Sequence, residues 1–367
     1  MIVFAHLLND RSGSPRILNT VIEGLPEAEK AVLYIGSDGD GILGSARIPK
    51  QTYWYRRTGN RLLTLAALML SQADLFWSLI RASDIPRDAI IYANTLLPFG
   101  AALYGRLSGR PVIFHIHEAS ISPPIFKAAL VMIARHTASR LIYVSRTHRE
   151  MLPIDDRRAT TVFNTIDKNL AEKAARHVYA PRRAGVFTVL MLSYARDYKG
   201  IPEFFRLAAS LIHRTDIAFH LVLSDLGPGT PLPLAGPNVS MLPPTDDTAD
   251  YFTAASLVLN LSRPDLCVET FGLTLLEAMA FGIPVIAPPV GGPAEIVTDR
   301  EDGLLIDSRD AAALTCAVEL LADDEILCAR LSGTARATAA RYSHNAFADG
   351  IADVLQAVRP ARPDHSG

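Results

Sequence analysis

The sequence is poor in cysteine: its 367 residues include only Cys267, Cys316 and Cys328. Three cysteines cannot build a disulfide framework, and none of them lies in a C-x-x-C pair, which argues against a structural zinc site. This cysteine usage is typical of a reducing compartment, so we expect a cytoplasmic protein.

Long uninterrupted apolar runs are also absent. The longest candidate, residues 62–80, contains Gln72 and Asp74, so we expect a buried helix there rather than a membrane span. The amino terminus has no basic segment ahead of an apolar run, and it predicts a first strand rather than a signal peptide. Charged residues make up 20% and hydrophobic residues 49%, which is a globular composition and excludes disordered and collagen-like chains.

Charge is divided unevenly along the chain. Residues 1–180 carry 22 Lys and Arg against 15 Asp and Glu, whereas the remaining residues carry 14 against 23. A basic first half indicates an anionic partner such as a phosphorylated lipid, a membrane surface or nucleic acid. Chance variation between the surfaces of two domains would give the same asymmetry.

Short β-branched apolar runs alternate with helical patterns, which predicts βαβ units and parallel sheets. Two such series predict an α/β chain of two Rossmann-like, doubly wound domains. The expected strands are residues 2–7, 31–35, 89–92, 112–115 and 141–144, followed by 188–192, 218–223, 239–241, 257–261 and 285–287. The expected parts are a domain over 1–170, a linker over 171–185, a domain over 186–340, a helix over 341–358 and a flexible tail over 359–367.

The segment from Glu269 to Ala287 carries the strongest functional signal. It predicts a loop, a helix beginning near Gly272 and ending at Gly282, and a strand. At the start of this helix the backbone amides of Leu273 and Thr274 are unpaired and form a phosphate site. Gly272 lets a ligand approach the backbone closely there. Glu269 and Glu277 could face one cleft and hold sugar or ribose hydroxyls. Alternatively, Glu269 is a helix-start carboxylate and Glu277 a solvated surface residue.

This segment, with the later motifs in residues 290–297 and 302–305 and the stretch Phe163 to Asp167, resembles retaining GT-B glycosyltransferases of family four. Thr165 replaces the glycine of the family's N-G-I-D motif. The resemblance covers residues from about 140 to 310. It implies two Rossmann-like domains facing across a cleft, with the acceptor on the first, the nucleotide sugar on the second, and the last helix crossing back to the first.

The resemblance also assigns site residues. Lys199, followed by a glycine, matches the family's lysine on the donor diphosphate; Arg196 would be the partnering arginine, although its spacing is shorter than the pattern, and it could instead pair with Asp197 on the surface. His117 falls on the strand-end histidine that contacts the transferred sugar. Gly13 corresponds to the family's glycine-rich loop, but a turn with Ser14 as N-cap and Pro15 at the first helical position explains that segment equally well.

Aromatic and basic residues alternate in a surface candidate consisting of Tyr53, Trp54, Arg56 and Arg57. This mixture suits an acceptor site or a membrane interface, and it also suits single-stranded nucleic acid or an ordinary loop. The glycines of residues 39–44 satisfy G-x-G-x-x-G, but no helical pattern follows them, which argues against a dinucleotide site. His115 and His117 could suggest a metal, yet no third ligand has motif spacing, so we expect no metal site.

The combined interpretation is a metal-independent retaining glycosyltransferase that moves a hexose from a nucleoside-diphosphate sugar to an acceptor hydroxyl. We expect no bound cofactor, a glycan or lipid-linked acceptor from cell-surface polysaccharide or glycolipid synthesis, and peripheral contact with an anionic membrane at its inner face. The alternatives are a nucleotide-sugar epimerase of the same fold, a phosphorylase needing a pyridoxal lysine that nothing singles out, and a nucleic-acid-binding protein using the basic half. Nucleic acid is not an expected partner, because that interpretation leaves Glu269 and Glu277 unexplained.

Overall fold

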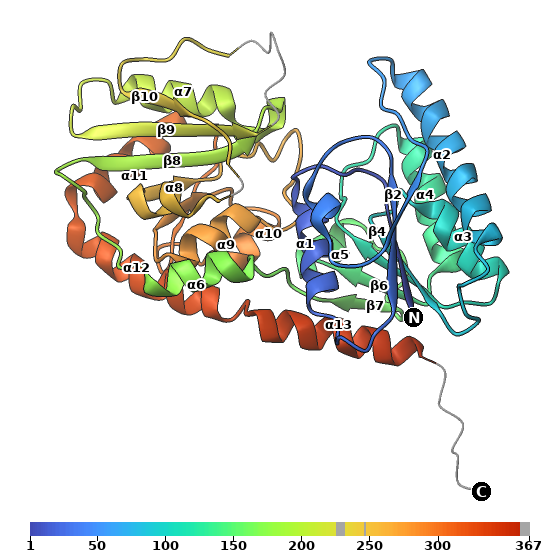
Figure 1. Cartoon of the computed structure of the whole chain (residues 1–367). Coiled ribbons are helices and arrows are strands. Elements are labelled where there is room, and N and C mark those ends of the chain that lie inside the picture. Colours follow the sequence, from blue (N-terminus) through green and yellow to red (C-terminus); the bar gives the residue numbers. More distant parts are fainter. Residues whose placement is uncertain (225–231, 246, 360–367) are drawn as a thin grey trace, which may run out of the picture. The chain divides into compact units, whose positions relative to one another are not determined.

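The computed structural model describes residues 1–224, 232–245 and 247–359 (Figure 1). The chain divides into two units, residues 1–163 with 345–367, and residues 164–344. The predicted flexible tail lies outside the described residues except for Arg359. The first unit is therefore assembled from two separate stretches of the chain.

The first unit contains a seven-stranded parallel sheet in the order β3-β2-β1-β4-β5-β6-β7. The order reverses direction on either side of β1, which pairs with both β2 and β4, as in a doubly wound fold. Its strands are β1 (Ile2–His6), β2 (Ala31–Gly36), β3 (Lys50–Tyr53), β4 (Ile90–Asn94), β5 (Val112–Ile116), β6 (Arg140–Tyr143) and β7 (Ala159–Thr161).

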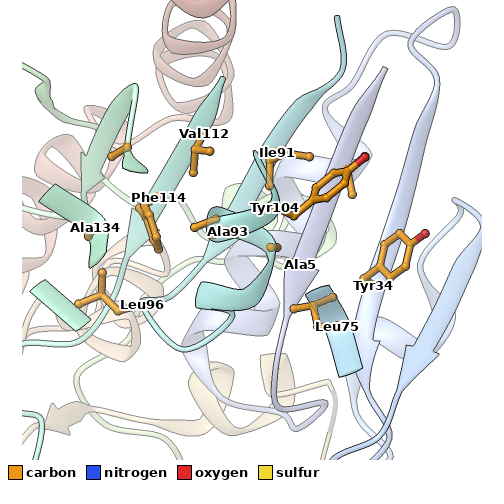
Figure 2. Close-up of a cluster of buried hydrophobic side chains, with 14 of the residues drawn as sticks. Ala5, Tyr34, Leu75, Ile91, Ala93, Leu96, Tyr104, Val112, Phe114 and Ala134 are labelled. Atoms are coloured by element: carbon orange, nitrogen blue, oxygen red, sulfur yellow. The ribbon is translucent and has the colours of Figure 1, made fainter. Parts of the chain in front are cut away.

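Helices cover both faces of this sheet. The elements between the strands are α1 (Gly13–Glu23), the 3-10 turn η1 (Ile42–Ser45), α2 (Arg61–Arg81), α3 (Phe99–Leu107), α4 (Pro124–Thr137) and α5 (Arg146–Met151), and α13 (His344–Val358) follows at the chain end. Figure 2 shows part of the core of this unit, which includes Leu75 of α2, Tyr104 of α3 and Ala134 of α4 together with strand residues such as Ala93 and Phe114. These strand residues alternate along β4 and β5, so one pleated face supplies the core.

The second unit contains a six-stranded parallel sheet in the order β10-β9-β8-β11-β12-β13. Its strands are β8 (Phe187–Tyr194), β9 (Ile217–Ser224), β10 (Val239–Leu242), β11 (Leu257–Leu259), β12 (Val285–Ala287) and β13 (Leu304–Leu305). The other elements are α6 (Lys168–Arg176), the 3-10 turn η2 (Asp197–Lys199), α7 (Ile201–Ser210), α8 (Ala249–Ala254), α9 (Leu273–Ala280), α10 (Gly292–Ile296), α11 (Ala311–Asp323) and α12 (Glu325–Ala340). The predicted doubly wound α/β class is confirmed for both units.

Several boundaries differ from the sequence-based expectations. Part of the expected linker forms α6, because Asp167 caps the Leu170 amide and Leu170 is buried. The first unit ends at Phe163 rather than at 170, and α13 begins at His344. Helix α1 begins at Gly13 with Ser12 as N-cap, so the expected cap at Ser14 is wrong.

Helix α2 departs from the expected buried helix. It is long and apolar enough to cross a membrane by length and composition alone, and 33% of its most apolar 18-residue window is buried. Gln72 lies on the buried side, where its Oε1 accepts the Gly100 amide over 3.0 Å. Only one side of α2 therefore faces the core.

Candidate functional site

The carboxyl ends of three adjacent parallel strands in the second unit carry the sequence-predicted donor residues. β8 pairs with β11, and β11 pairs with β12. Lys199 follows β8, Glu269 follows β11, and Gly291 follows β12. Because the carboxyl ends of parallel strands share one edge of the sheet, the three loops after them meet where open α/β folds bind ligands.

Lys199 and Glu269 form an ion pair at this edge. Lys199 Nζ lies 2.7 Å from Glu269 Oε2, and the Ser262 hydroxyl donates to the same oxygen over 2.8 Å. The Asn260 side chain, which also bonds Glu269, accepts the Ser262 amide over 3.0 Å and thereby holds the loop in place. The structure thus brings together two residues predicted from separate motifs, and it adds Asn260 and Ser262.

The electrostatics keep both members of the pair charged. Burial alone would raise the pKa of Glu269, but the Lys199 ammonium and the hydrogen bonds from Lys199, Ser262 and Asn260 bring that pKa below its ordinary value. Burial alone would lower the pKa of Lys199, but the Glu269 carboxylate raises it overall. The site therefore holds a carboxylate acceptor beside a fixed cation at neutral pH.

Close loop packing fixes this geometry. Gly200 has a φ of +74°, and a Cβ there would lie 2.0 Å from the Leu261 carbonyl oxygen. A Cβ at Gly291 would lie 2.5 Å from the Glu269 carbonyl oxygen, and one at Gly292 would lie 2.3 Å from Phe271 Cα. The glycines allow the three loops to approach more closely than any other residue would permit. The glycine pair in residues 291–292 is the sequence feature that marks the loop packed against Glu269 and Phe271.

Helix α9 begins where the sequence predicts. Its N-cap is Gly272, which has a φ of +101° and no side chain that could cap the helix, and the first turn contains no acidic residue. The amide groups of Leu273 and Thr274 open the helix, as expected of a site for an anion. Glu277 is only 5% exposed, so the alternative of a solvated surface residue is wrong.

Arg196 lies at the same strand end as Lys199. It precedes η2, is half-buried, and donates from Nη1 to the Ala195 carbonyl oxygen over 3.1 Å. Arg263, which follows β11 and was not predicted, donates its amide to the Tyr198 carbonyl oxygen and pairs with Asp265. The role of Arg196 toward a diphosphate stays a prediction.

The first unit gathers polar side chains at the carboxyl ends of β1, β4 and β5. His117 Nε2 lies 3.0 Å from Asn94 Oδ1, while Asn94 Nδ2 donates to the Ser14 carbonyl oxygen over 3.1 Å. Because Ser14 O can only accept, this amide is oriented with Oδ1 toward His117, so His117 carries its proton on Nε2. His6 Nδ1 donates to the Asn94 carbonyl oxygen over 3.1 Å.

The histidines around this point stay neutral. The His115 and His117 ring centroids are 4.4 Å apart, which confirms that both side chains share one face. Burial lowers the pKa of His115 to about 3 and that of His148 to about 4, and it lowers the pKa values of His6 and His117 as well. His117 is therefore suited to polar contact with an uncharged group and unsuited to pairing as a cation.

Gly13 begins α1 with open space beside it: apart from its chain neighbours and the backbone of its own helix, no heavy atom lies within 4 Å of the position that a Cβ would take. Gly39 and Gly41 of the G-x-G-x-x-G stretch instead pack against the backbone of Asn9 and Asp10, and the 3-10 turn η1 follows them. The glycines of this stretch therefore serve loop packing, as the absence of a helical pattern indicated.

The aromatic and basic surface candidate is partly wrong. Tyr53 is 1% exposed and donates its hydroxyl to the His6 carbonyl oxygen, so it belongs to the core and cannot contact an acceptor or a membrane. Tyr53 is the last residue of β3, whose other three residues are exposed, and its ring belongs to the hydrophobic core of the first unit. Trp54, Arg56 and Arg57 are exposed.

Metal ligands do not converge in the described part of the chain. There, no group of three or more His, Cys, Asp or Glu side chains is placed to hold a metal ion.

Comparisons with known proteins agree with this arrangement. Residues 180–338 match the family model of glycosyl transferases group 1. The D-inositol 3-phosphate glycosyltransferase of Thermobispora bispora is 27% identical over 61% of this chain and 56% of its own length. The probable sucrose-phosphate synthase 5 of Oryza sativa subsp. japonica is 54% identical over 15% of this chain and 6% of its own length. The chain thus spans less than two thirds of either relative.

Solved structures extend the likeness to both units. Anabaena HepE in complex with UDP-glucose superposes with a TM-score of 0.78 and 21% identity, over 97% of this chain and 99% of that one. At this identity the likeness shows the fold. The chain therefore has the GT-B fold, and residues 180–338, within its second unit, match the glycosyl transferases group 1 family.

Proposed function

We propose that the protein transfers a hexose, with retention at the anomeric carbon, from a nucleoside-diphosphate sugar to an acceptor hydroxyl. The observation that carries this proposal is the Lys199–Glu269 ion pair in the loops that lead to the start of α9, where the N-cap is Gly272. A cation, a hydrogen-bond-accepting carboxylate and a helix N-terminus together match a phosphorylated sugar. The HepE structure, which contains UDP-glucose, supports a nucleotide-sugar donor for this fold.

The departing diphosphate sets the main chemical demand. Negative charge grows on the leaving oxygen as the sugar–phosphate bond breaks, and fixed positive charge lowers the barrier most where that charge develops. Lys199, Arg196 and the α9 amides of Leu273 and Thr274 would supply it. In this proposal these groups do the work that a divalent metal does elsewhere, so no metal or other cofactor is required.

The two glutamates would hold hydroxyl groups. Glu269 is held ionised by Lys199 and would therefore accept hydrogen bonds from a sugar bound beside this ion pair. Glu277, buried within α9, would accept from the ribose. The acceptor hydroxyl attacks from the face that the diphosphate leaves, and the leaving phosphate takes its proton, so the proposal names no general base.

His117 would contact the transferred sugar from the first unit. Its low pKa, caused by burial and by the neighbouring histidines, keeps it neutral, so it can hydrogen-bond a hydroxyl without repelling or attracting the phosphates. Asn94 fixes its tautomer. Gly13, at the open start of α1, would let the acceptor or the diphosphate approach the backbone.

Peripheral contact with an anionic membrane at the cytoplasmic side is part of the same proposal, with a glycan or lipid-linked acceptor of cell-surface polysaccharide or glycolipid synthesis. Its support is the outer side of α2. The Trp54 amide donates to Asp74 of α2 over 2.7 Å, so the exposed Trp54 lies beside that helix. The large apolar side chains exposed on α2 are Leu62, Leu63, Met69, Leu70, Trp77 and Ile80.

Exposed cations border this apolar surface, namely Arg56 and Arg57 before α2 and Arg61 and Arg81 at its two ends. Apolar side chains inserted at the boundary of the lipid headgroups and cations at their level are the combination that binds anionic bilayers.

A thermal-shift panel of nucleoside diphosphates and their sugars, without and with magnesium, tests the donor site. A ligand at 100 times its Kd stabilises the folded protein by about 2.7 kcal/mol, enough to raise the melting temperature by a few degrees. We expect one nucleotide to act selectively without magnesium, and the shift to disappear in Lys199→Ala and Glu277→Ala. No shift with any nucleotide, or consumption of the donor without transfer to an acceptor, would overturn the proposal.

A further inference from the structure

A cluster of basic side chains lies at the edge of the first unit's sheet opposite to His117. A cavity of about 820 Å³ opens there, among the loops that lead into β4, β5, β6 and β7. Its ionisable lining residues are Arg87, Asp88, Arg106, Arg110, His136 and Arg158. Four arginines thus converge with a single lining carboxylate, at the amino-terminal ends of the strands, where the proposed transferase chemistry uses no residue.

Two of these arginines are held by the protein itself. Arg110 donates to the carbonyl oxygens of Ile85 and Pro86 over 2.8 and 3.0 Å, and its guanidinium lies 5.1 Å from the Tyr104 ring centroid. Arg158 pairs with Asp155 over 2.7 Å. These contacts fix both guanidinium planes before any ligand arrives, which lowers the entropic cost of binding.

The other two arginines have uncompensated charge. Arg87 and Arg106 are exposed, and within the described residues neither has an ion-pair partner. Like charges gathered around one cavity raise each other's energy and produce a local positive potential. An anion in the cavity would offset that repulsion.

We propose that this cavity binds the phosphate group of an anionic ligand. The planar guanidinium fork matches phosphate oxygens in pairs, so Arg87 and Arg106, which have no ion-pair partner within the described residues, favour phosphate. Arg106 on α3 neighbours the exposed Leu107, and His136 on α4 lies one turn after the exposed Met132. The phosphate could therefore come from a free polyphosphate or from a lipid headgroup whose chains lie over these apolar side chains.

The test follows His136, which lines the cavity, in the full-length chain labelled with 15N-histidine. Its ring signals are assigned by their loss in His136→Gln. Sodium pyrophosphate is then titrated at constant ionic strength. Pyrophosphate in the donor site would leave His136 unchanged, so failure of this proposal and failure of the proposed transferase are distinguished. We expect a saturable shift of the His136 signals.

The variant Arg87→Ala/Arg106→Ala should weaken that binding about tenfold or more, because it removes the two uncompensated cations. The charge-matched control Lys30→Ala/Arg47→Ala removes two exposed cations of the same unit outside the cavity, and it should retain the affinity of the parent protein. Both variants should keep the parent melting temperature.

Vesicles distinguish the two sources of phosphate. Phosphatidylglycerol vesicles that displace pyrophosphate from His136, where phosphatidylcholine vesicles do not, would assign the cavity to a lipid headgroup. Pyrophosphate binding without displacement would assign it to a soluble phosphate. No saturable shift with either probe, or equal affinity in the double-alanine variant and the parent, would overturn the proposal.

Discussion

At the residue scale, the Lys199–Glu269 pair joins stability to function. Removing one member leaves the other as an unpaired, largely buried charge, so Lys199→Ala should lower the free energy of unfolding by about 2–3 kcal/mol. The double variant Lys199→Met/Glu269→Gln removes both charges and should recover most of that loss while remaining inactive. Urea denaturation of the single and double variants measures this. Equal stability of Lys199→Ala and the parent would show that the pair contributes nothing to folding.

The buried histidines make the first unit sensitive to acid. Their pKa values are below the unfolded value of 6.5, so their stabilising effect is complete above pH 6.5 and is lost as the pH falls toward about 4 and 3, the folded values of His148 and His115. Between pH 6.5 and 5.5 these two residues together should cost about 2 kcal/mol.

Denaturation curves across that pH range measure the slope. In His148→Gln the side-chain amide can still donate to the Glu118 carbonyl oxygen, but it does not titrate, so this variant should flatten the curve. The exposed His136→Gln is the matched control. A parent protein whose stability does not change from pH 7 to 5 would contradict the neutral state inferred for the cluster.

At the element scale, glycines at different positions should differ sharply in their tolerance of an added methyl group. Gly292→Ala places Cβ 2.3 Å from Phe271 Cα, where backbone must move, whereas Gly13→Ala meets no atom within 4 Å. We expect Gly292→Ala to lower the melting temperature by several degrees and Gly13→Ala to leave it unchanged or slightly raised. A KM increase in Gly13→Ala at unchanged stability would support its predicted substrate contact. Equal melting temperatures of the two variants would contradict the loop packing.

The outer side of α2 offers a second test at this scale. The variant Leu63→Ser/Leu70→Ser/Trp77→Ser should lose binding to phosphatidylglycerol vesicles in sedimentation, because it removes exposed apolar area without touching the core. The control Ile212→Ser/Leu320→Ser/Ile326→Ser changes exposed apolar residues of the second unit and should bind as the parent does. Unchanged sedimentation of the α2 variant would remove the membrane from the proposal.

The elements also show what sequence reasoning can reach. Long, buried, β-branched strands such as β1 and β8 were predicted nearly to the residue, because a strand buried on both faces is a continuous hydrophobic run in the sequence. β3, β7 and β13 were missed, since they have only two to four residues, and the exposed residues of β3, such as Lys50 and Gln51, are polar. Helix α6 was missed because its mean hydropathy is low and only two of its residues are buried.

The sequence predicted the site residues that would contact the substrate directly, and it missed the residues that hydrogen-bond to them. Lys199, Glu269 and Glu277 stand in recognisable motifs. Ser262 and Asn94 do not, because their importance comes from hydrogen bonds, to Glu269 within the loop after β11 and to His117 after the neighbouring strand β5. The first bond depends on how the loop folds and the second on strand order, and sequence spacing reveals neither.

At the scale of the whole molecule, truncation after His344 should separate the fates of the two units. It removes α13, whose buried side chains include Phe347, Ile351 and Leu355, from the first unit. The second unit, residues 164–344, stays intact in the chain. We expect hydrogen exchange to show protection of β8 and β11 but loss of protection at β1 and β7. Retained protection throughout the first sheet would contradict the assignment of α13 to that unit.

The passage of α13 from one unit into the other has a consequence for biosynthesis. A ribosome delivers residues 1–163 first, yet these residues wait for the segment after His344 before their unit is complete. A Cβ at Gly350 would lie 3.0 Å from Val162, so the last helix closes directly over the strand-end residues that emerged much earlier. The second unit, contiguous in the chain, can fold while the first is still open. The first unit is therefore synthesised first but completed last. A chain interrupted before α13 leaves the ribosome with its second unit formed and its first unit incomplete.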